Sequence, residues 1–326
     1  MERHRVGEAA VAEARADFPR HIGARVRTMS RADRMTNREW WELSEEFLRY
    51  LGALSVEYPG LETPEAKFVL DNAAEAAAGA VSYAAYYPYE SFSIFLNYVN
   101  FGMSYEAGAS GEPARIGADE WLGAFCLMVL AGTTERHREA LRLTRQSPQA
   151  DRTGCATAEL INGLMAYVLG DMGNDDADYP PSTEQKLAAI DAALARVHAS
   201  ADETGQSRPV RGDFTALLAV RALAAGDRAR FEETLTTLLL QHRETSQGVG
   251  QPGSLLPLLP LALAALACRR EGWLPAVDTD YLPYALVTGF VAPELSGSES
   301  GAVSRADMIA DLASGAVLRE RPEGRG

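Results

Sequence analysis

One glycine-rich segment of the chain has the spacing of a dinucleotide-binding loop. The stretch Gly248–Gly253 reads Gly-Val-Gly-Gln-Pro-Gly. Pyrophosphate binding by such a loop needs a strand before it and the first turn of a helix after it. Here a helix predicted over residues 227–245 precedes the loop, and Pro252 removes one backbone donor from it. The pattern therefore predicts a connection between helices.

An acidic stretch offers the oxygen ligands that calcium prefers. Its carboxylates are those of Asp171, Asp175, Asp176 and Asp178. In a calcium loop starting at Asn174, Tyr179 would replace the required glycine and Gln185 would replace the bidentate glutamate. We therefore expect an exposed loop that holds no metal, with contact to a partner protein as the functional alternative.

The other side chains capable of chemistry form no recognisable constellation. The five histidines lack the paired spacing of a zinc site, and none is close to a cysteine in sequence. No serine lies in a nucleophile elbow, and nothing places one carboxylate of a pair in an apolar pocket. His242 ends a strongly apolar helix, where we expect a cationic or capping role. These patterns favour a binding protein without a cofactor over an enzyme.

Aromatic side chains are concentrated between residues 83 and 105. They are Tyr83, Tyr86, Tyr87, Tyr89, Phe92, Phe95, Tyr98, Phe101 and Tyr105. Residues 92–99 mix β-branched and aromatic types and a turn signal follows, so we predict a short β-hairpin near residues 90–105. Two interpretations of the rings remain open, namely ordinary core and a recognition surface or ligand pocket. The binding candidates are Tyr83, Tyr86, Tyr87, Tyr98 and Trp121.

Helical periodicity predicts the elements that position these residues. The expected helices include residues 6–29, 119–131, 134–146, 154–170, 183–201, 211–225, 227–245 and 254–271. The apolar run Leu255–Cys268 contains two prolines and falls short of the roughly 20 residues that span a bilayer, so we expect a buried core helix. The predicted fold is all-α, an antiparallel multi-helix array with solenoid-like stacking. We expect one helical domain over residues 1–295 and a flexible tail with a short helix over 296–326.

Composition limits the classes of partner. The chain has 326 residues and a formal net charge of -14, which repels nucleic acid and anionic lipid and attracts basic partners. Three dispersed cysteines suit a reducing compartment, and the charged N-terminus lacks the apolar run of a signal peptide. We therefore expect a cytoplasmic protein that binds neither nucleic acid nor membrane.

Two segments carry a resemblance to a known family. Asp119–Phe125 followed by Thr134–Arg136 reads as a tryptophan-led helix and then an acid–arginine pair. Pro257–Leu286 joins a proline-led helix of small residues to an acidic turn and a Tyr-Leu-Pro segment. Between them, Phe231 and His242 lie early and late in one predicted helix. In this order and spacing, residues 119–290 resemble the bacterial immunity protein 49 family.

The resemblance implies an all-helical immunity protein of a polymorphic toxin system, which binds a toxin domain and blocks its active site. It transfers no catalytic residue. The acidic charge would suit a basic toxin such as a nuclease, because complementary fields speed association. Asp278 and Asp280 are expected to cap a short helix that begins near Tyr281, with direct contact to the toxin as the alternative.

A rival hypothesis belongs to another class. On the same scaffold, Tyr86, Tyr98 and Trp121 would surround an apolar cavity, as in a small-molecule-binding protein or a cryptic enzyme of a specialised biosynthetic pathway. A scaffold protein with a concave groove is a third interpretation. A homodimer is left open by the sequence.

Overall fold

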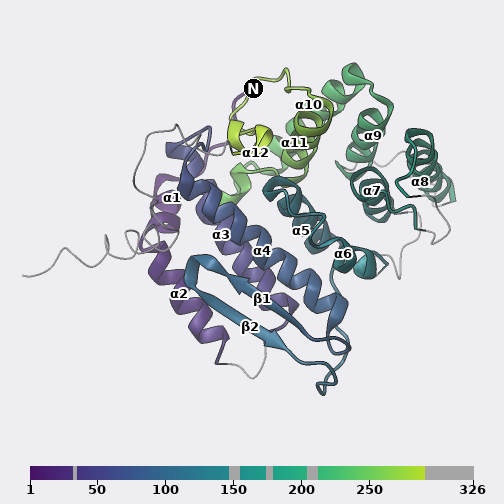
Figure 1. The fold of residues 1–326 in the computed structure, drawn as a ribbon. Coiled ribbons are helices and arrows are strands. Elements are labelled where there is room, and N and C mark those ends of the chain that lie inside the picture. The colour runs from purple at the N-terminus through teal and green to yellow at the C-terminus, as the bar shows by residue number, and fades with distance from the viewer. Residues whose placement is uncertain (32–34, 147–154, 174–178, 204–211, 291–326) are drawn as a thin grey trace, which may run out of the picture. The chain divides into compact units, whose positions relative to one another are not determined.

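The computed structural model describes residues 1–31, 35–146, 155–173, 179–203 and 212–290 (Figure 1). Residues Met1–Phe290 belong to one compact unit, and a second unit covers Val291–Gly326. The second unit lies outside the described residues, and so does the predicted tail.

The described part of the chain is predominantly helical with one two-stranded sheet, which confirms the predicted fold class and hairpin. The elements of the first half are α1 (Glu8–Arg15), α2 (Phe18–Met29), α3 (Asn37–Glu57), α4 (Pro64–Tyr86), β1 (Phe92–Leu96), η1 (Asn97–Val99) and β2 (Phe101–Tyr105). Those of the second half are α5 (Ala118–Ala131), α6 (Arg138–Thr144), α7 (Ala156–Leu164), η3 (Met165–Leu169), α8 (Thr183–Glu203), α9 (Gly212–Ala225), α10 (Arg228–Thr245), η4 (Pro252–Leu255), α11 (Leu258–Glu271) and α12 (Tyr284–Thr288).

The alanine-rich helix α4 lets the antiparallel hairpin lie close to the helical core. The strands pair from Phe92 opposite Tyr105 to Leu96 opposite Phe101. A Cβ added to Gly79 of α4 would lie 3.0 Å from the side chain of Ile94. One face of the hairpin is therefore packed on α4, while alternate residues point outward.

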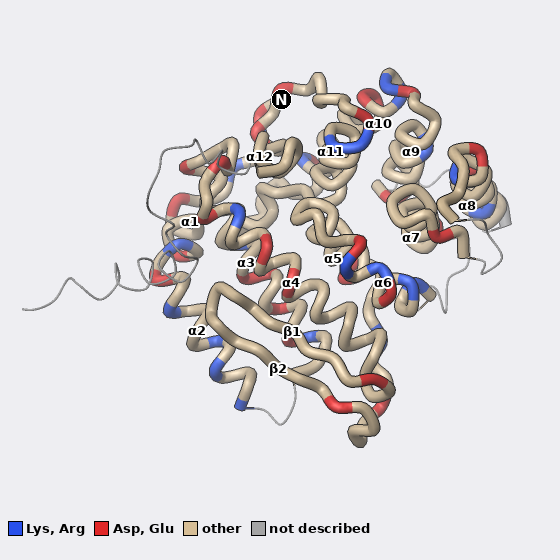
Figure 2. Tube along the Cα trace, viewed as in Figure 1, with Lys and Arg blue, Asp and Glu red and all other residues tan. Residues whose placement is uncertain are grey.

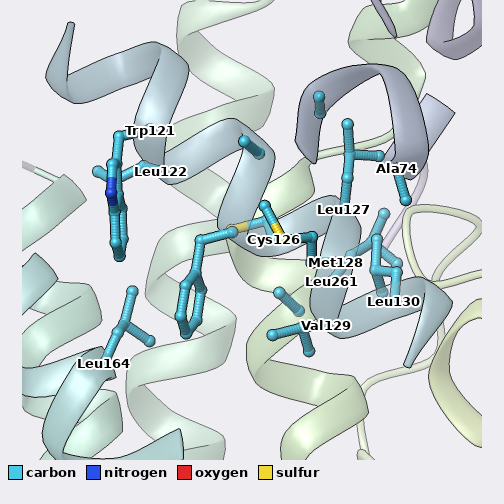
Figure 3. Close-up of a cluster of buried hydrophobic side chains, with 14 of the residues drawn as sticks. Ala74, Trp121, Leu122, Cys126, Leu127, Met128, Val129, Leu130, Leu164 and Leu261 are labelled. Carbon is cyan, nitrogen blue, oxygen red and sulfur yellow. The ribbon is translucent and has the colours of Figure 1, made fainter. Parts of the chain in front are cut away.

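The core of the second half surrounds α5 (Figure 3). Nearly every side chain from Trp121 to Leu130 is buried on this helix, and Leu164 of α7 and Leu261 of α11 pack against it. The Trp121 indole is completely buried, and its Nε1 donates a hydrogen bond of 3.0 Å to the Thr144 hydroxyl. An apolar helix without a polar face belongs in the interior of the fold.

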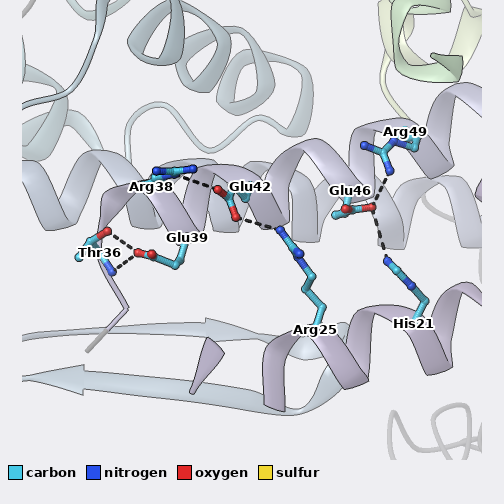
Figure 4. Close-up of polar contacts among 8 residues, drawn as sticks. All are labelled: His21, Arg25, Thr36, Arg38, Glu39, Glu42, Glu46 and Arg49. Carbon is cyan, nitrogen blue, oxygen red and sulfur yellow. Dashed lines mark hydrogen bonds and ion pairs between the residues drawn. The ribbon is translucent and has the colours of Figure 1, made fainter. Parts of the chain in front are cut away.

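Ion pairs join α2 to α3 at their outer faces (Figure 4). Glu42 accepts from Arg25 of α2 at 2.8 Å and from Arg38 of its own helix at 3.0 Å. The Thr36 backbone N–H donates to Glu39 at 2.7 Å, which completes a capping box at the start of α3. These contacts fix where α3 begins and how α2 lies along it.

Two adjacent arginines at the end of α11 cap other helices. The Arg269 guanidinium donates to the carbonyl oxygens of Val129 and Leu130 at 3.0 Å, and to Leu286 at 2.7 Å. Arg270 donates to the carbonyl oxygens of Tyr167 and Val168. Cations bonded to the last carbonyls of helices satisfy acceptors that have no partner within the helix.

Two of the predicted helices are interrupted. The helix expected over residues 6–29 is broken between α1 and α2, where Asp17 adopts a left-handed conformation with φ of 48° and Pro19 follows. The helix expected over residues 254–271 begins as η4 and restarts after Pro257 as α11. Both predictions of one continuous helix are wrong. The helical spacing of apolar residues continues on both sides of each break, so this pattern does not reveal the break.

One stretch, Pro252–Glu271, is long and apolar enough by composition to cross a membrane, but 67% of its apolar window is buried inside the protein. No other stretch of the described ranges meets the same criteria. Its burial agrees with the core helix expected there.

Candidate functional site

Three of the predicted binding residues belong to the core. Tyr83, Tyr87 and Trp121 are each at most 2% exposed. Tyr83 stacks on Tyr87 with ring centroids 4.7 Å apart, and Tyr105 meets Tyr83 edge to face. A partner that binds the folded surface would not touch these side chains.

The structure does not bring Tyr86 and Tyr98 together, so the cavity lined by Tyr86, Tyr98 and Trp121 that would favour the small-molecule hypothesis is not formed. Tyr98 stacks on Phe68 near the start of α4, whereas Tyr86 lies at the end of the same helix. Eighteen residues of α-helix separate these two places, a distance of about 27 Å. The length of α4 keeps the rings of Tyr86 and Tyr98 apart.

Tyr86 is half-buried and faces carboxylates. Burial, followed by the charges of Glu139 and Glu90, raises the pKa of Tyr86 to about 12. Tyr89 beside it is 68% exposed. The strands of the neighbouring hairpin carry no charge, and Glu90 and Glu106 flank them (Figure 2). Tyr86 thus lies at an acidic margin of the aromatic region, close to Glu139 and Glu90.

The acidic loop residues Asp175, Asp176 and Asp178 lie outside the described residues. Asp171, just before them, accepts a bond of 3.1 Å from Arg145. Among the residues that the structure describes, no group of three or more His, Cys, Asp or Glu side chains is arranged to hold a metal ion.

Asp278 and Asp280 do not cap a helix, which corrects the role expected from the sequence. Helix α12 begins at Tyr284 with Pro283 as its N-cap residue, and no side chain caps it. Both aspartates are exposed and precede that helix in an irregular segment. The exposure of both carboxylates therefore favours a role at the surface.

The two aspartates belong to a surface made from two distant parts of the sequence. The Ala285 N–H donates to the Gly60 carbonyl oxygen at 3.0 Å, which joins α12 to the turn between α3 and α4. Tyr284, which precedes Ala285 in α12, is 55% exposed, and Tyr58, two residues before Gly60, is 42% exposed. We name this the tyrosine–carboxylate surface and define it by the exposed residues Tyr58, Glu62, Asp278, Asp280 and Tyr284.

Its chemistry suits protein recognition. Exposed tyrosines provide rigid contact area with a polar tip, and carboxylates beside them favour a basic partner. The Arg3 guanidinium borders the surface and donates to the Ser55 hydroxyl and carbonyl oxygens, while burial lowers the pKa of Arg3 and nearby Asp280 opposes that shift.

The sequence had identified Asp278 and Asp280 as candidates but missed both surface tyrosines. Tyr58 follows the last residue of α3, and Tyr284 is the first residue of α12. Each adjoins a proline, Pro59 or Pro283. Helical periodicity does not assign terminal residues to a face, so proline adjacency was the only signal at these positions.

A family model described as Immunity protein 49 matches residues 61–286, most of the chain. The chain belongs to the immunity protein 49 family. The match confirms the resemblance and extends it toward the N-terminus, through α4 and the hairpin. No curated protein and no solved structure matches the chain.

Membership places the chain among immunity proteins, a family that implies binding of a cognate toxin. The matched region ends at residue 286, inside α12. It therefore contains Glu62, Asp278, Asp280 and Tyr284 of the tyrosine–carboxylate surface and excludes Tyr58.

Proposed function

We propose that this immunity protein 49 family member binds one cognate toxin domain and neutralises it by blocking its active site in the cytoplasm of the producing cell. The family match over residues 61–286 carries the proposal. Stoichiometric binding needs no catalytic group, and it depends on an exposed surface of suitable chemistry.

The tyrosine–carboxylate surface is the interface in this proposal. Two half-exposed tyrosines lie beside three exposed carboxylates there, in a chain with a net charge of -14. Tyrosines are frequent hot-spot residues, and carboxylates around them would attract a basic toxin such as a nuclease. The favoured partner is therefore a toxin domain with a basic active-site face.

Co-expression with each toxin-like gene encoded beside this chain tests the proposal. We expect one toxin to be neutralised, with growth restored and a one-to-one complex recovered with an inactivated form of that toxin. Growth without a complex would contradict neutralisation by binding. Failure of every neighbouring toxin to be neutralised would contradict the immunity function in this genetic setting.

Surface variants then locate the interface. The double variant Asp280→Lys, Tyr284→Ala should abolish rescue while the protein remains folded. Leu143→Ala is the matched control, because Leu143 is also exposed, at 54%, but belongs to α6. If Leu143→Ala loses rescue and the double variant keeps it, the interface does not lie on the tyrosine–carboxylate surface.

A further inference from the structure

The segment before α1 is held against the C-terminal part of the same unit through His4. The His4 side chain is 8% exposed, and its Nδ1 lies 2.7 Å from the Tyr281 hydroxyl. That same hydroxyl oxygen accepts the His4 backbone N–H at 2.8 Å. On the other side of the ring, Nε2 lies 2.9 Å from the Ser254 hydroxyl. The arm, residues 1–7, is therefore joined by His4 to both η4 and the segment before α12.

The bonding pattern assigns the tautomer of His4. Ser254 donates its hydroxyl hydrogen to the Gln251 carbonyl oxygen at 2.6 Å, so its oxygen is free to accept from His4 Nε2–H. His4 Nδ1 is then the acceptor for the hydroxyl hydrogen of Tyr281. A neutral imidazole with its proton on Nε2 satisfies each group, which is what a buried polar cluster requires.

Neighbouring residues of the arm reach the same surface. Arg3 bonds to Ser55 at the end of α3, and the Met1 nitrogen donates to the Asp278 carbonyl oxygen at 2.5 Å. Asp278 and Asp280 thus lie in a segment held at one end by Met1 and at the other by completely buried Tyr281. The arm lies outside the matched family region, which begins at residue 61.

We propose that His4 is a positioning residue of the tyrosine–carboxylate surface, which fixes the segment of Asp278 and Asp280 by binding the Tyr281 hydroxyl. The inference rests on the proposed function, because it concerns the geometry of the same interface. Without the His4 bond, Tyr281 would lose the acceptor for its hydroxyl hydrogen, and a buried group without a partner favours rearrangement. The two carboxylates would then sample several positions, which weakens binding to a rigid partner.

The protonation state of His4 gives this role a measurable signature. The titratable groups that face it are Arg3 on the arm, His242 on α10 and Tyr281 before α12, and Asp280 in turn acts on Arg3. Burial, then His242 and then Arg3, lowers the pKa of His4 below 6.5. Protonated Nδ1 could no longer accept from the Tyr281 hydroxyl.

The direction of the pH effect follows from the lowered pKa. A released arm binds more protons than the docked arm once the pH falls below 6.5, the ordinary histidine value. Docking is therefore fully present above pH 6.5 and weakens as the pH falls toward the lowered pKa. Burial also lowers the pKa of His242, so a cationic role for His242, expected from the sequence, is not supported at neutral pH.

Hydrogen exchange of the full-length protein tests the inference without the toxin. Exchange in residues 276–284, corrected for the intrinsic effect of pH, should accelerate about tenfold in His4→Ala and Tyr281→Phe at pH 8. His4→Gln should keep protection, because its amide can donate to Ser254 and accept from Tyr281. In wild type, protection should fall between pH 7 and 5, and in His4→Gln it should not.

His21→Gln is the matched control, because the His21 side chain is 57% exposed on α2. It should behave as wild type at each pH. Unchanged exchange in both His4→Ala and Tyr281→Phe, or a full pH response in His4→Gln, would overturn the inference. Unfolding midpoints of all variants separate a local change from loss of the fold.

The affinity for the toxin that is neutralised in the rescue test, measured with its inactivated form, tests the same inference at the level of function. His4→Ala should raise the Kd about tenfold at pH 8, and His4→Gln should restore it. Looser exchange with an unchanged Kd would refute the role of His4 at the interface and leave toxin binding intact. Absence of any neutralised toxin would instead refute the proposed function, while the exchange results would stand.

Discussion

The aromatic region around the hairpin and the tyrosine–carboxylate surface both contain tyrosines, but they use them differently. In the aromatic region, the Tyr105 hydroxyl accepts from Trp40 Nε1 at 2.7 Å and donates to the Met35 carbonyl oxygen at 2.8 Å. Tyr284, by contrast, stays 55% exposed at the start of a five-residue helix. A tyrosine is buried where its hydroxyl finds internal partners, so residue type alone does not distinguish core from interface.

The largest expected effect comes from the aromatic region. Trp40→Ala should lower the free energy of unfolding by about 3–5 kcal/mol, because it removes a fully buried indole and leaves a cavity. Denaturant unfolding measures the loss. The fraction of the variant that stays folded should bind toxin with an unchanged Kd. A raised Kd without the expected loss of stability would show that the aromatic region belongs to the interface.

A binding effect without a stability effect is expected at the surface. Tyr284→Ala should weaken toxin binding by about 2 kcal/mol, or roughly 30-fold in Kd, and change the stability by no more than about 0.5 kcal/mol. Calorimetric titration and denaturant unfolding check the two halves. The matched control is Phe95→Ala, since Phe95 is 45% exposed on the hairpin. Equal losses of affinity in both variants would show that the hairpin and the tyrosine–carboxylate surface belong to one interface.

The carboxylates should act mainly on the rate of association. Asp278→Asn combined with Asp280→Asn should slow association with a basic toxin severalfold at low salt and leave dissociation nearly unchanged. High salt should abolish the difference, because it screens exposed charges. Stopped-flow measurements over a range of ionic strength test this, and a purely dissociative effect would show that the carboxylates make buried contacts instead.

The smallest effect is expected at the margin of the aromatic region. Tyr86→Phe removes a half-buried hydroxyl beside carboxylates and should change stability by no more than about 0.5 kcal/mol, without altering toxin affinity. In wild type, ultraviolet titration should show Tyr86 ionising near pH 12, the value raised by burial and by the neighbouring carboxylates. Ionisation near the ordinary value of 10.0 would place Tyr86 in solvent and make it a surface candidate again.

The sequence predicted much of the local structure because local signals specify it. At the start of α4, for example, Pro64 is the first helical residue and the Thr63 hydroxyl accepts from the Ala66 N–H, and both residue types favour the first turn of a helix. The hairpin followed from the mixture of β-branched and aromatic residues and from a turn signal, and Asn100 adopts the left-handed conformation in that turn. The break at Asp17 was missed, since one left-handed residue hardly changes the apolar spacing.

The site was less predictable than the fold. Among the binding candidates, only the exposed Asp278 and Asp280 belong to the tyrosine–carboxylate surface, and their assigned role as helix caps was wrong. The sequence did not indicate Tyr58 and Tyr284 as candidates, because their exposure depends on how the end of α3 lies next to α12. That junction is made by a bond between residues 60 and 285, which no local pattern encodes.

By itself, the sequence determined the helical class, the hairpin, the acidic charge and the family, since periodicity, turn residues and composition act over a few positions at a time. Tertiary structure alone decided which tyrosines are buried and where the carboxylates lie. It also brought His4 to Tyr281, 277 positions away, and Arg269 to the carbonyl oxygen of Val129, 140 positions away. Such bonds depend on the packing of the whole unit, because a buried polar group needs a hydrogen-bond partner and these groups find theirs far away in the sequence.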